Sequence, residues 1–249
     1  MSYLREFTMA RVGLGRAGDA LPTEVMLELR RARAAAADAV HEEMHVGALV
    51  MECEQRGWPC IAVRSAARNR AEYLRRPDLG RIIHKDSQAT MTAGPFDLSL
   101  IVADGLSALA VHRHAFPVLG RLIPKLRDAS WRLAPIILVE RGRVAIGDQI
   151  ARLLDAQISL ILIGERPGMT SPDSLGAYLT WQPRPGKTDA ERNCISNIRP
   201  EGLNYDEAAD RLFSLVTESR RRQISGIELK EDHALGHHQH VSLDSSRQR

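Results

Sequence analysis

The sequence is poor in cysteine and in aromatic residues. Its three cysteines, Cys53, Cys60 and Cys194, form no CxxC motif and leave at least one unpaired. This usage fits a reducing cytosolic compartment better than secretion. Aromatic side chains make up only 4% of the chain, which is too few for a surface on which nucleic-acid bases stack.

Long apolar runs and an excess of charge are also missing. No apolar run approaches the ~18 residues of a membrane span, and the N-terminal sequence MSYLREFTMARVG lacks the apolar core of a signal peptide. Basic and acidic residues number 34 and 31, a balance that gives no general argument for binding nucleic acid or a membrane. We therefore expect a cytoplasmic protein that binds neither.

What is present is the composition of a soluble globular protein, with 44% hydrophobic and 26% charged residues. A chain of 249 residues is long enough for one large domain, or for one domain with an extension. The sequence therefore predicts a folded chain with a sizeable core, and the pattern of apolar segments decides its class.

The most informative stretch is the apolar run 158–163, ISLILI, which predicts a strand buried on both faces. Gly164 ends the run, and Glu165, Arg166, Pro167 and Gly168 follow. In an open α/β sheet, ligands bind at such carboxyl strand ends. The Glu–Arg pair is therefore a candidate ligand contact, and a solvated pair in an ordinary turn is the alternative on this pattern alone.

Strand and helix patterns alternate through the rest of the chain. We expect strands at 60–64, 98–103, 135–139, 158–163 and 177–182, and helices at 66–74, 106–127, 145–154 and 207–222. The helix at 106–127 is interrupted near Pro117, and 85–94 is expected to be a loop. This alternation predicts an α/β fold with a doubly wound, mostly parallel sheet, Rossmann-like or flavodoxin-like. Asp104, the turn 141–143 and Glu165 should then meet at one edge of the sheet.

A helical extension precedes this pattern at residues 1–56. The segment 23–51 reads as one helix capped by Thr23. His41 and His45 lie four residues apart but have no third ligand nearby, so a structural or exposed role is favoured over a metal site. The polar, histidine-containing segment 231–249 is expected to be disordered.

The glycines at 13, 15 and 18 satisfy the G-x-G-x-x-G spacing. The segment before them is too mixed in character for the buried strand that a dinucleotide site requires. We expect instead a backbone turn that presents Arg11 and Arg16 to an anion or to a partner.

Seven short motifs, read together, resemble one known family. They are ARV at 10–12 with GRAG at 15–18, RPDLGR at 76–81, DGLS at 104–107, GRV at 142–144, DQI at 148–150, GERPG at 164–168 and CISNI at 194–198. In this order they closely resemble the small (light) subunit of ethanolamine ammonia-lyase, from about residue 8 to about residue 230. The resemblance implies an adenosylcobalamin-dependent carbon–nitrogen lyase that converts ethanolamine to acetaldehyde and ammonia. It also implies an obligate large subunit, whose barrel carries the substrate site.

The resemblance assigns this chain a cobalamin-binding surface and no catalytic residue or metal ligand. The positions that match the family's corrinoid contacts are Val144, Glu165 and Cys194. Val144 offers a backbone group to the amide-fringed ring, Glu165 accepts hydrogen bonds from corrin amides, and Cys194 packs as a small residue with no sign of a lowered pKa. The implied organisation is a cobalamin-binding domain at 57–230 and an N-terminal segment, 1–56, that contacts the large subunit.

The resemblance also bears on cobalt ligation and on location. The chain has one near match to the D-x-H-x-x-G motif through which other proteins supply a histidine to cobalt, at Glu231, His233 and Gly236. It follows the last expected helix with no strand before it, so we interpret it as chance and expect the cofactor to keep its own base. The implied location is the cytoplasm, including the interior of a bacterial microcompartment.

Two other classes of function are weaker. A flavodoxin-like nucleotide-binding regulator needs a glycine-rich phosphate loop after a strand, and the only candidate, residues 104–107, is too acidic and too poor in glycine. A nucleic-acid binder would use Arg220, Arg221 and Arg222. Three arginines at the end of a helix are better explained as complementing the helix dipole.

Overall fold

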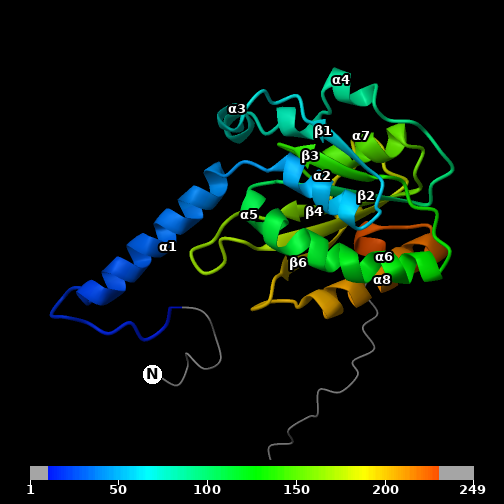
Figure 1. The fold of residues 1–249 in the computed structure, drawn as a ribbon. Coiled ribbons are helices and arrows are strands. Elements are labelled where there is room, and N and C mark those ends of the chain that lie inside the picture. Colours follow the sequence, from blue (N-terminus) through cyan, green and yellow to red (C-terminus); the bar gives the residue numbers. More distant parts are fainter. Residues whose placement is uncertain (1–10, 230–249) are drawn as a thin grey trace, which may run out of the picture.

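The computed structural model describes residues 11–229, and the expectations for Ala10 and for the segment 231–249 lie outside them. The body is built on a six-stranded sheet in the order β1-β3-β2-β4-β5-β6 (Figure 1). Its strands are β1 (Cys60–Arg64), β2 (Leu98–Ala103), β3 (Ile136–Glu140), β4 (Ile158–Gly164), β5 (Leu175–Trp181) and β6 (Asn193–Ile198).

The sheet is mixed. Strands β1, β3, β2 and β4 run parallel, whereas β5 pairs antiparallel with β4, and β6 pairs antiparallel with β5. The α/β class is therefore confirmed, and the expected parallel arrangement applies to four strands. Strand β6 is missing from the sequence prediction because it has no apolar run: only Ile195 and Ile198 are buried in it.

Helices cover both faces of the sheet, with a hydrophobic core on each side. One face packs against α2 (Val46–Gln55), α6 (Phe116–Asp128) and α8 (Tyr205–Arg222), and the other against α7 (Ile146–Leu153). Every residue of β2 and of β4 is buried as a result. This two-sided burial explains why both strands are continuous apolar runs in the sequence.

The N-terminal helix is broken where one continuous helix was expected. Helix α1 (Thr23–His41) ends at Glu42, whose backbone is extended, and α2 begins at Val46. The break turns Met44 into the core and lets the His45 amide donate a hydrogen bond of 3.0 Å to His112 Nε2. Thr23 does not cap the helix, because Pro22 occupies the cap position and no side chain caps it. Helix α1 projects from the body, and Ala39 is its only buried residue (Figure 1).

Three other helical segments differ from the expected bounds. Helix α3 (Arg70–Arg75) starts later than expected because Asn69 caps it and accepts a hydrogen bond from the Glu72 amide. The expected loop at 85–94 contains the short helix α4 (Lys85–Gln88). The expected interruption near Pro117 is a π-helical turn, η3 (Val111–Ala115), between the short helix α5 (Ala108–Ala110) and α6.

Three 3₁₀ turns complete the described elements: η2 (Leu79–Arg81), η4 (Asp189–Glu191) and η5 (Gly226–Glu228). None of the helices in residues 11–229 combines the length and the apolar character that crossing a membrane requires.

Candidate functional site

The carboxyl edge of the parallel strands brings together Asp104 and the turn 141–143, as the sequence predicts. Asp104 follows β2, and its Oδ1 accepts a hydrogen bond of 3.1 Å from the Gly142 amide, which follows β3. Its Oδ2 lies 3.1 Å from Arg70 Nη1 in an ion pair in which both side chains are buried. Burial raises the pKa of the Asp104 carboxyl to about 6, against the opposing effects of Arg70 and the backbone amides of the turn.

Arg70 connects this edge to the N-terminal helix. Its Nε donates to the Val40 carbonyl at 2.8 Å, in the last turn of α1, and its Nη1 donates to the Gly105 carbonyl at 2.8 Å. Gly105 has a φ of +54°, and a Cβ there would lie 2.2 Å from the Gly164 carbonyl oxygen. The turn after β2 therefore packs closely against the end of β4, and the Leu106 amide donates to the Gly164 carbonyl at 2.9 Å.

A buried tyrosine supports the turn after β3. The Tyr73 hydroxyl donates to the Gly142 carbonyl at 2.9 Å, and the guanidinium groups of Arg70 and Arg143 lie 5.0 and 4.5 Å from the centre of its ring. A Cβ on Gly80 would lie 2.6 Å from Tyr73 Cε2, so only glycine fits there. Three of the sequence motifs, RPDLGR, DGLS and GRV, thus pack against one another around Tyr73.

Glu165 lies at the end of β4, one strand further along the edge. Its Oε2 accepts hydrogen bonds from Ser174 Oγ at 2.5 Å and from the Asn197 amide at 3.3 Å. Its Oε1 accepts no hydrogen bond within residues 11–229. A Cβ on Gly176 would lie 2.8 Å from this oxygen, so the glycine provides the space that the carboxylate occupies. One oxygen of Glu165 is held by the protein, and the other is free to accept from a ligand.

Cys194 lies next to Tyr178 on the neighbouring strand, and both are near Glu165. Tyr178 and Cys194 are directly paired across β5 and β6, so their side chains lie next to each other on one face of the sheet. Cys194 is solvent-exposed as a residue, yet neighbouring atoms desolvate its sulfur and raise the pKa of the thiol. Glu165 is close enough to raise the pKa of both groups further. Cys194 is therefore a protonated thiol at neutral pH.

Val144 lies at the start of α7, on the same face of the sheet as Tyr178. Both are half-buried and pack against the core cluster that contains Ile163. The Val144 carbonyl accepts a hydrogen bond of 3.1 Å from the Gly147 amide, whereas its own amide has no hydrogen-bond partner in the described part of the chain. The structure thus places Glu165 and Cys194 next to each other, with Val144 across β4 on that face.

Comparison with known proteins identifies the family. The chain matches the family model "Ethanolamine ammonia-lyase light chain (EutC)" over residues 1–230. The chain belongs to the ethanolamine ammonia-lyase light chain family. It is 50% identical over 235 residues to the ethanolamine ammonia-lyase small subunit of Pseudomonas fluorescens, covering 92% of this chain and 86% of that protein. It is 52% identical over 235 residues to the small subunit of Azotobacter vinelandii, covering 92% and 87%.

Sequence reasoning about this light chain missed the residues that support Glu165. Ser174, Gly176 and Tyr178 lie in or next to β5, whose start was placed two residues too late. In a strand that starts at Leu175, Gly176 and Tyr178 lie two residues apart and therefore on one face of the sheet. Asn197 lies within the CISNI motif, but no local pattern indicates that its amide donates to Glu165, 32 residues away in the chain.

The N-terminal segment of the light chain reaches the same edge. From sequence order, residues 10–18 are expected to lie away from the ligand-binding edge. One contact approaches that region: Arg11 Nη2 donates a hydrogen bond of 3.3 Å to the Met169 carbonyl in the loop after Glu165. Positive φ values at Gly13, Gly15 and Gly18 agree with the expected backbone turn.

The other candidate residues do not form ligand sites in the described structure. No cluster of three or more potential metal ligands occurs among residues 11–229, and His45 stacks on His112 with ring centres 5.0 Å apart. Arg220 lies over Trp131 at 4.7 Å, and Arg221 pairs with Glu218 at 2.5 Å. These intramolecular contacts account for the arginines at the end of α8.

Proposed function

We propose that this light chain is the small subunit of an adenosylcobalamin-dependent ethanolamine ammonia-lyase, a carbon–nitrogen lyase that converts ethanolamine to acetaldehyde and ammonia. Family membership over nearly the whole chain supports the activity. The observation that carries the cofactor assignment is the free Oε1 of Glu165, held next to Cys194 and on the face that also bears Val144.

The residues on this face fit a corrin ring whose edge carries amides. Glu165 Oε1 is an unused acceptor, and the Val144 amide is an unused donor. Tyr178 and Cys194 add a neutral, partly apolar surface, because burial raises the pKa of both groups and keeps them protonated. Two fixed polar contacts beside neutral side chains suit a large cofactor that needs orientation more than charge.

The chain's own part in the reaction is to bind and orient. Adenosylcobalamin, when bound, supplies the radical chemistry. Glu165 and the Val144 amide would fix the ring, and Cys194 would pack against it. The parallel strands β3 and β4 would hold Val144 and Glu165 at their carboxyl edge, and β6 would hold Cys194. The substrate site is assigned to the large subunit, and no catalytic residue is assigned to this chain.

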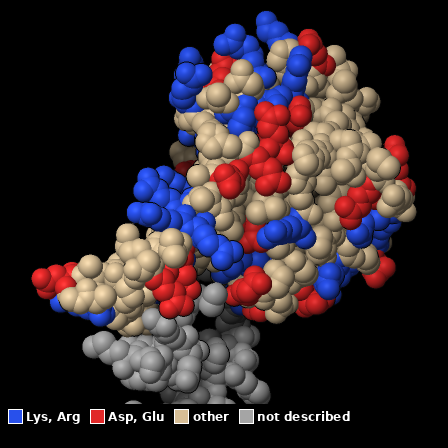
Figure 2. Space-filling view, turned by 60° about the vertical axis from the view of Figure 1, so that its left-hand side comes forward, with Lys and Arg blue, Asp and Glu red and all other residues tan. Residues whose placement is uncertain are grey.

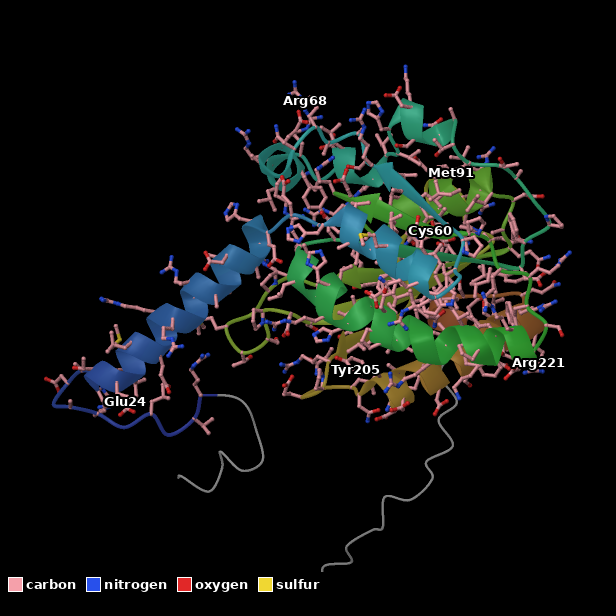
Figure 3. The ribbon with its side chains drawn as sticks, viewed as in Figure 1. Glu24, Cys60, Arg68, Met91, Tyr205 and Arg221 are labelled. Carbon is pink, nitrogen blue, oxygen red and sulfur yellow. The ribbon has the colours of Figure 1, made fainter. Side chains whose placement is uncertain are left out.

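Residues 1–56 are proposed to contact the large subunit, and residues 57–230 to form the cobalamin-binding domain. Helix α1 stands out from the body, with Glu24 at its outer end (Figure 3). Its Leu27 is 56% exposed and Met26 is 39% exposed. A projecting helix with exposed apolar side chains gains stability when a partner covers it. Figure 2, which turns the left side of Figure 1 forward, shows this helix extending beyond the body, with Lys and Arg side chains gathered at the top and at the middle left of the view.

Reconstitution tests the proposed function. The purified chain should release no ammonia from ethanolamine by itself or with adenosylcobalamin. Addition of the large subunit should produce ammonia release that depends on both proteins and on the cofactor. Turnover by the isolated chain, or no gain when this chain joins the large subunit, would contradict the proposal. We further propose a cytoplasmic location, in cells with microcompartments inside that shell.

A further inference from the structure

The loop of residues 165–174, which joins β4 to β5, is anchored near its end by groups on the helical segment after β2. Glu165 begins the loop, and its amide donates to the Ser174 carbonyl at 2.9 Å. The Pro172 carbonyl accepts a hydrogen bond of 2.9 Å from Ser107 Oγ. Asp173 lies between these two fixed residues and is only 9% exposed.

Asp173 is held from one direction by the π-helical turn η3. Its Oδ2 accepts a hydrogen bond of 2.8 Å from Arg113 Nη1 and lies 3.3 Å from His114 Nε2. Arg113 and His114 are consecutive residues of η3, and a π-helical turn changes the directions in which successive side chains point. The irregular turn thus coincides with the two residues that contact the loop.

His114 is itself fixed from its other side. It is 3% exposed, and its Nδ1 lies 2.8 Å from the Tyr205 hydroxyl at the start of α8. Its Nε2 is buried and has no hydrogen-bond partner with good geometry among the described residues, although Asp173 is the nearest carboxylate. Burial lowers the pKa of His114 and so favours the neutral ring. A neutral ring whose Nδ1 accepts from the Tyr205 hydroxyl carries its proton on Nε2, which lies 3.3 Å from Asp173 Oδ2. Tyr205 appears below the helix that follows η3 in Figure 3.

We propose that Arg113 and His114 are positioning residues for the cofactor surface, because they hold Asp173 and thereby fix the Glu165 carboxylate. Asp173 is bonded through the backbone to Ser174, whose hydroxyl occupies Glu165 Oε2. Fixing Asp173 therefore fixes which oxygen of Glu165 remains free and where it points. The proposal rests on the proposed function, since it concerns the same cofactor surface.

The test uses the assembled two-subunit enzyme and the change Asp173→Asn, which keeps the size of the side chain and removes its charge. We expect the dissociation constant for adenosylcobalamin to rise at least about fivefold, because the variant loses one charge-assisted hydrogen bond that holds the loop. Amide hydrogen exchange of peptides covering residues 165–174 should become faster. The rate at saturating cofactor should change less than the dissociation constant. His114→Gln, which retains a donor near the position of Nε2, should partly preserve the affinity, and His114→Ala should not.

Asp97→Asn is the matched control. Asp97 is also a buried carboxylate paired with an arginine, Arg132, at 2.6 Å, but it precedes β2 and therefore lies at the opposite edge of the sheet. This variant should lose thermal stability without a change in cofactor affinity or in exchange at residues 165–174. If Asp97→Asn and Asp173→Asn weaken the cofactor equally, the effect is general destabilisation and the proposal is overturned.

A double-mutant cycle separates this proposal from the proposed function. If Asp173 acts through Glu165, Asp173→Asn should add less than about a twofold effect in a Glu165→Ala background. A full additive effect there, or an unchanged dissociation constant in Asp173→Asn alone while Glu165→Ala is impaired, refutes the positioning role. An unchanged dissociation constant in Glu165→Ala refutes the cofactor surface itself.

Discussion

Ser174 Oγ donates a hydrogen bond of 2.5 Å to Glu165 Oε2, across the two ends of the loop between β4 and β5. The bond gives the two oxygens of one carboxylate different roles. Oε2 is bound within the protein, and Oε1 is left over the backbone of Gly176. A glutamate that would otherwise rotate freely at the end of a strand is thereby set in one orientation, which lowers the entropy cost of a ligand contact.

Removal of this carboxylate should weaken the binding of the cofactor more than the binding of the substrate. In the assembled enzyme, Glu165→Ala leaves corrin amide donors unpaired, at a cost of about 1–3 kcal/mol, or roughly 5- to 150-fold in the dissociation constant for adenosylcobalamin. The KM for ethanolamine should change little, because the substrate site is assigned to the large subunit. Glu207→Ala on α8, an exposed helix-surface glutamate, is the control and should leave both values unchanged. Equal affinity for the cofactor in both variants would count against the assignment.

Gly176→Ala should displace Glu165 without removing it. The new Cβ would lie 2.8 Å from Oε1 and 3.0 Å from Cγ of Glu165, closer than side chains tolerate. We expect a weaker affinity for adenosylcobalamin, of the same order as in Glu165→Ala, with little loss of stability because alanine suits a strand backbone. Gly47→Ala in α2 meets nothing within 4 Å and should instead stabilise the fold by about 0.5–1 kcal/mol. Cofactor titration measures the affinity of both variants, and urea unfolding measures their stability. Unaltered cofactor affinity in Gly176→Ala would show that the Glu165 carboxylate can adopt another position that still binds the cofactor.

The buried ion pair between Asp148 and Arg192 should dominate the stability of the β5–β6 side. Both Asp148 oxygens accept from Arg192, at 2.7 and 2.6 Å, and both side chains are buried. Asp148→Ala leaves the arginine charge buried without its partner and should lower the free energy of unfolding by about 3–5 kcal/mol. The exposed pair of Lys125 with Asp210 gives the comparison, since Asp210→Ala should cost about 0–1 kcal/mol. Urea denaturation measures the free energy of unfolding of the two variants. Similar decreases in both would mean that the buried pair does not dominate the stability of this side.

Removal of residues 1–18 should weaken assembly with the large subunit while the α/β body still folds. The described part of this segment contacts the body through Arg11, whose side chain donates to the Met169 carbonyl. Interface arginines commonly anchor binding, so a loss on the order of 1–2 kcal/mol in assembly is expected. Light scattering against protein concentration measures it, and circular dichroism checks the fold. The single change Arg11→Ala removes only the hydrogen bond to Met169, so comparing its assembly with that of the truncated chain shows how much of the loss comes from this contact. Assembly at the same concentrations as the full chain would exclude an interface role.

The sequence by itself determined the layers of the fold and the edge of the sheet at which the candidate site lies. The strands at 98–103 and 158–163 are continuous apolar runs because both of their faces are covered, and this signal is local. The charged and glycine residues that follow each strand share one edge because parallel strands end on the same side. The choice of Val144, Glu165 and Cys194 came from the family resemblance, and their role at the cofactor stays a prediction.

Only the tertiary structure decided how these residues are supported. Strand β6 exists because β5 offers it a hydrogen-bonding edge and α8 covers Ile195 and Ile198 from one side, which no local pattern encodes. The break between α1 and α2 coincides with the burial of Met44 in the core. The links from Arg11 to Met169, from Arg70 to Asp104 and from His114 to Asp173 join residues far apart in the chain. The periodicity of the sequence indicates which side of a helix or strand is buried. Which residues it packs against depends on how the whole chain folds.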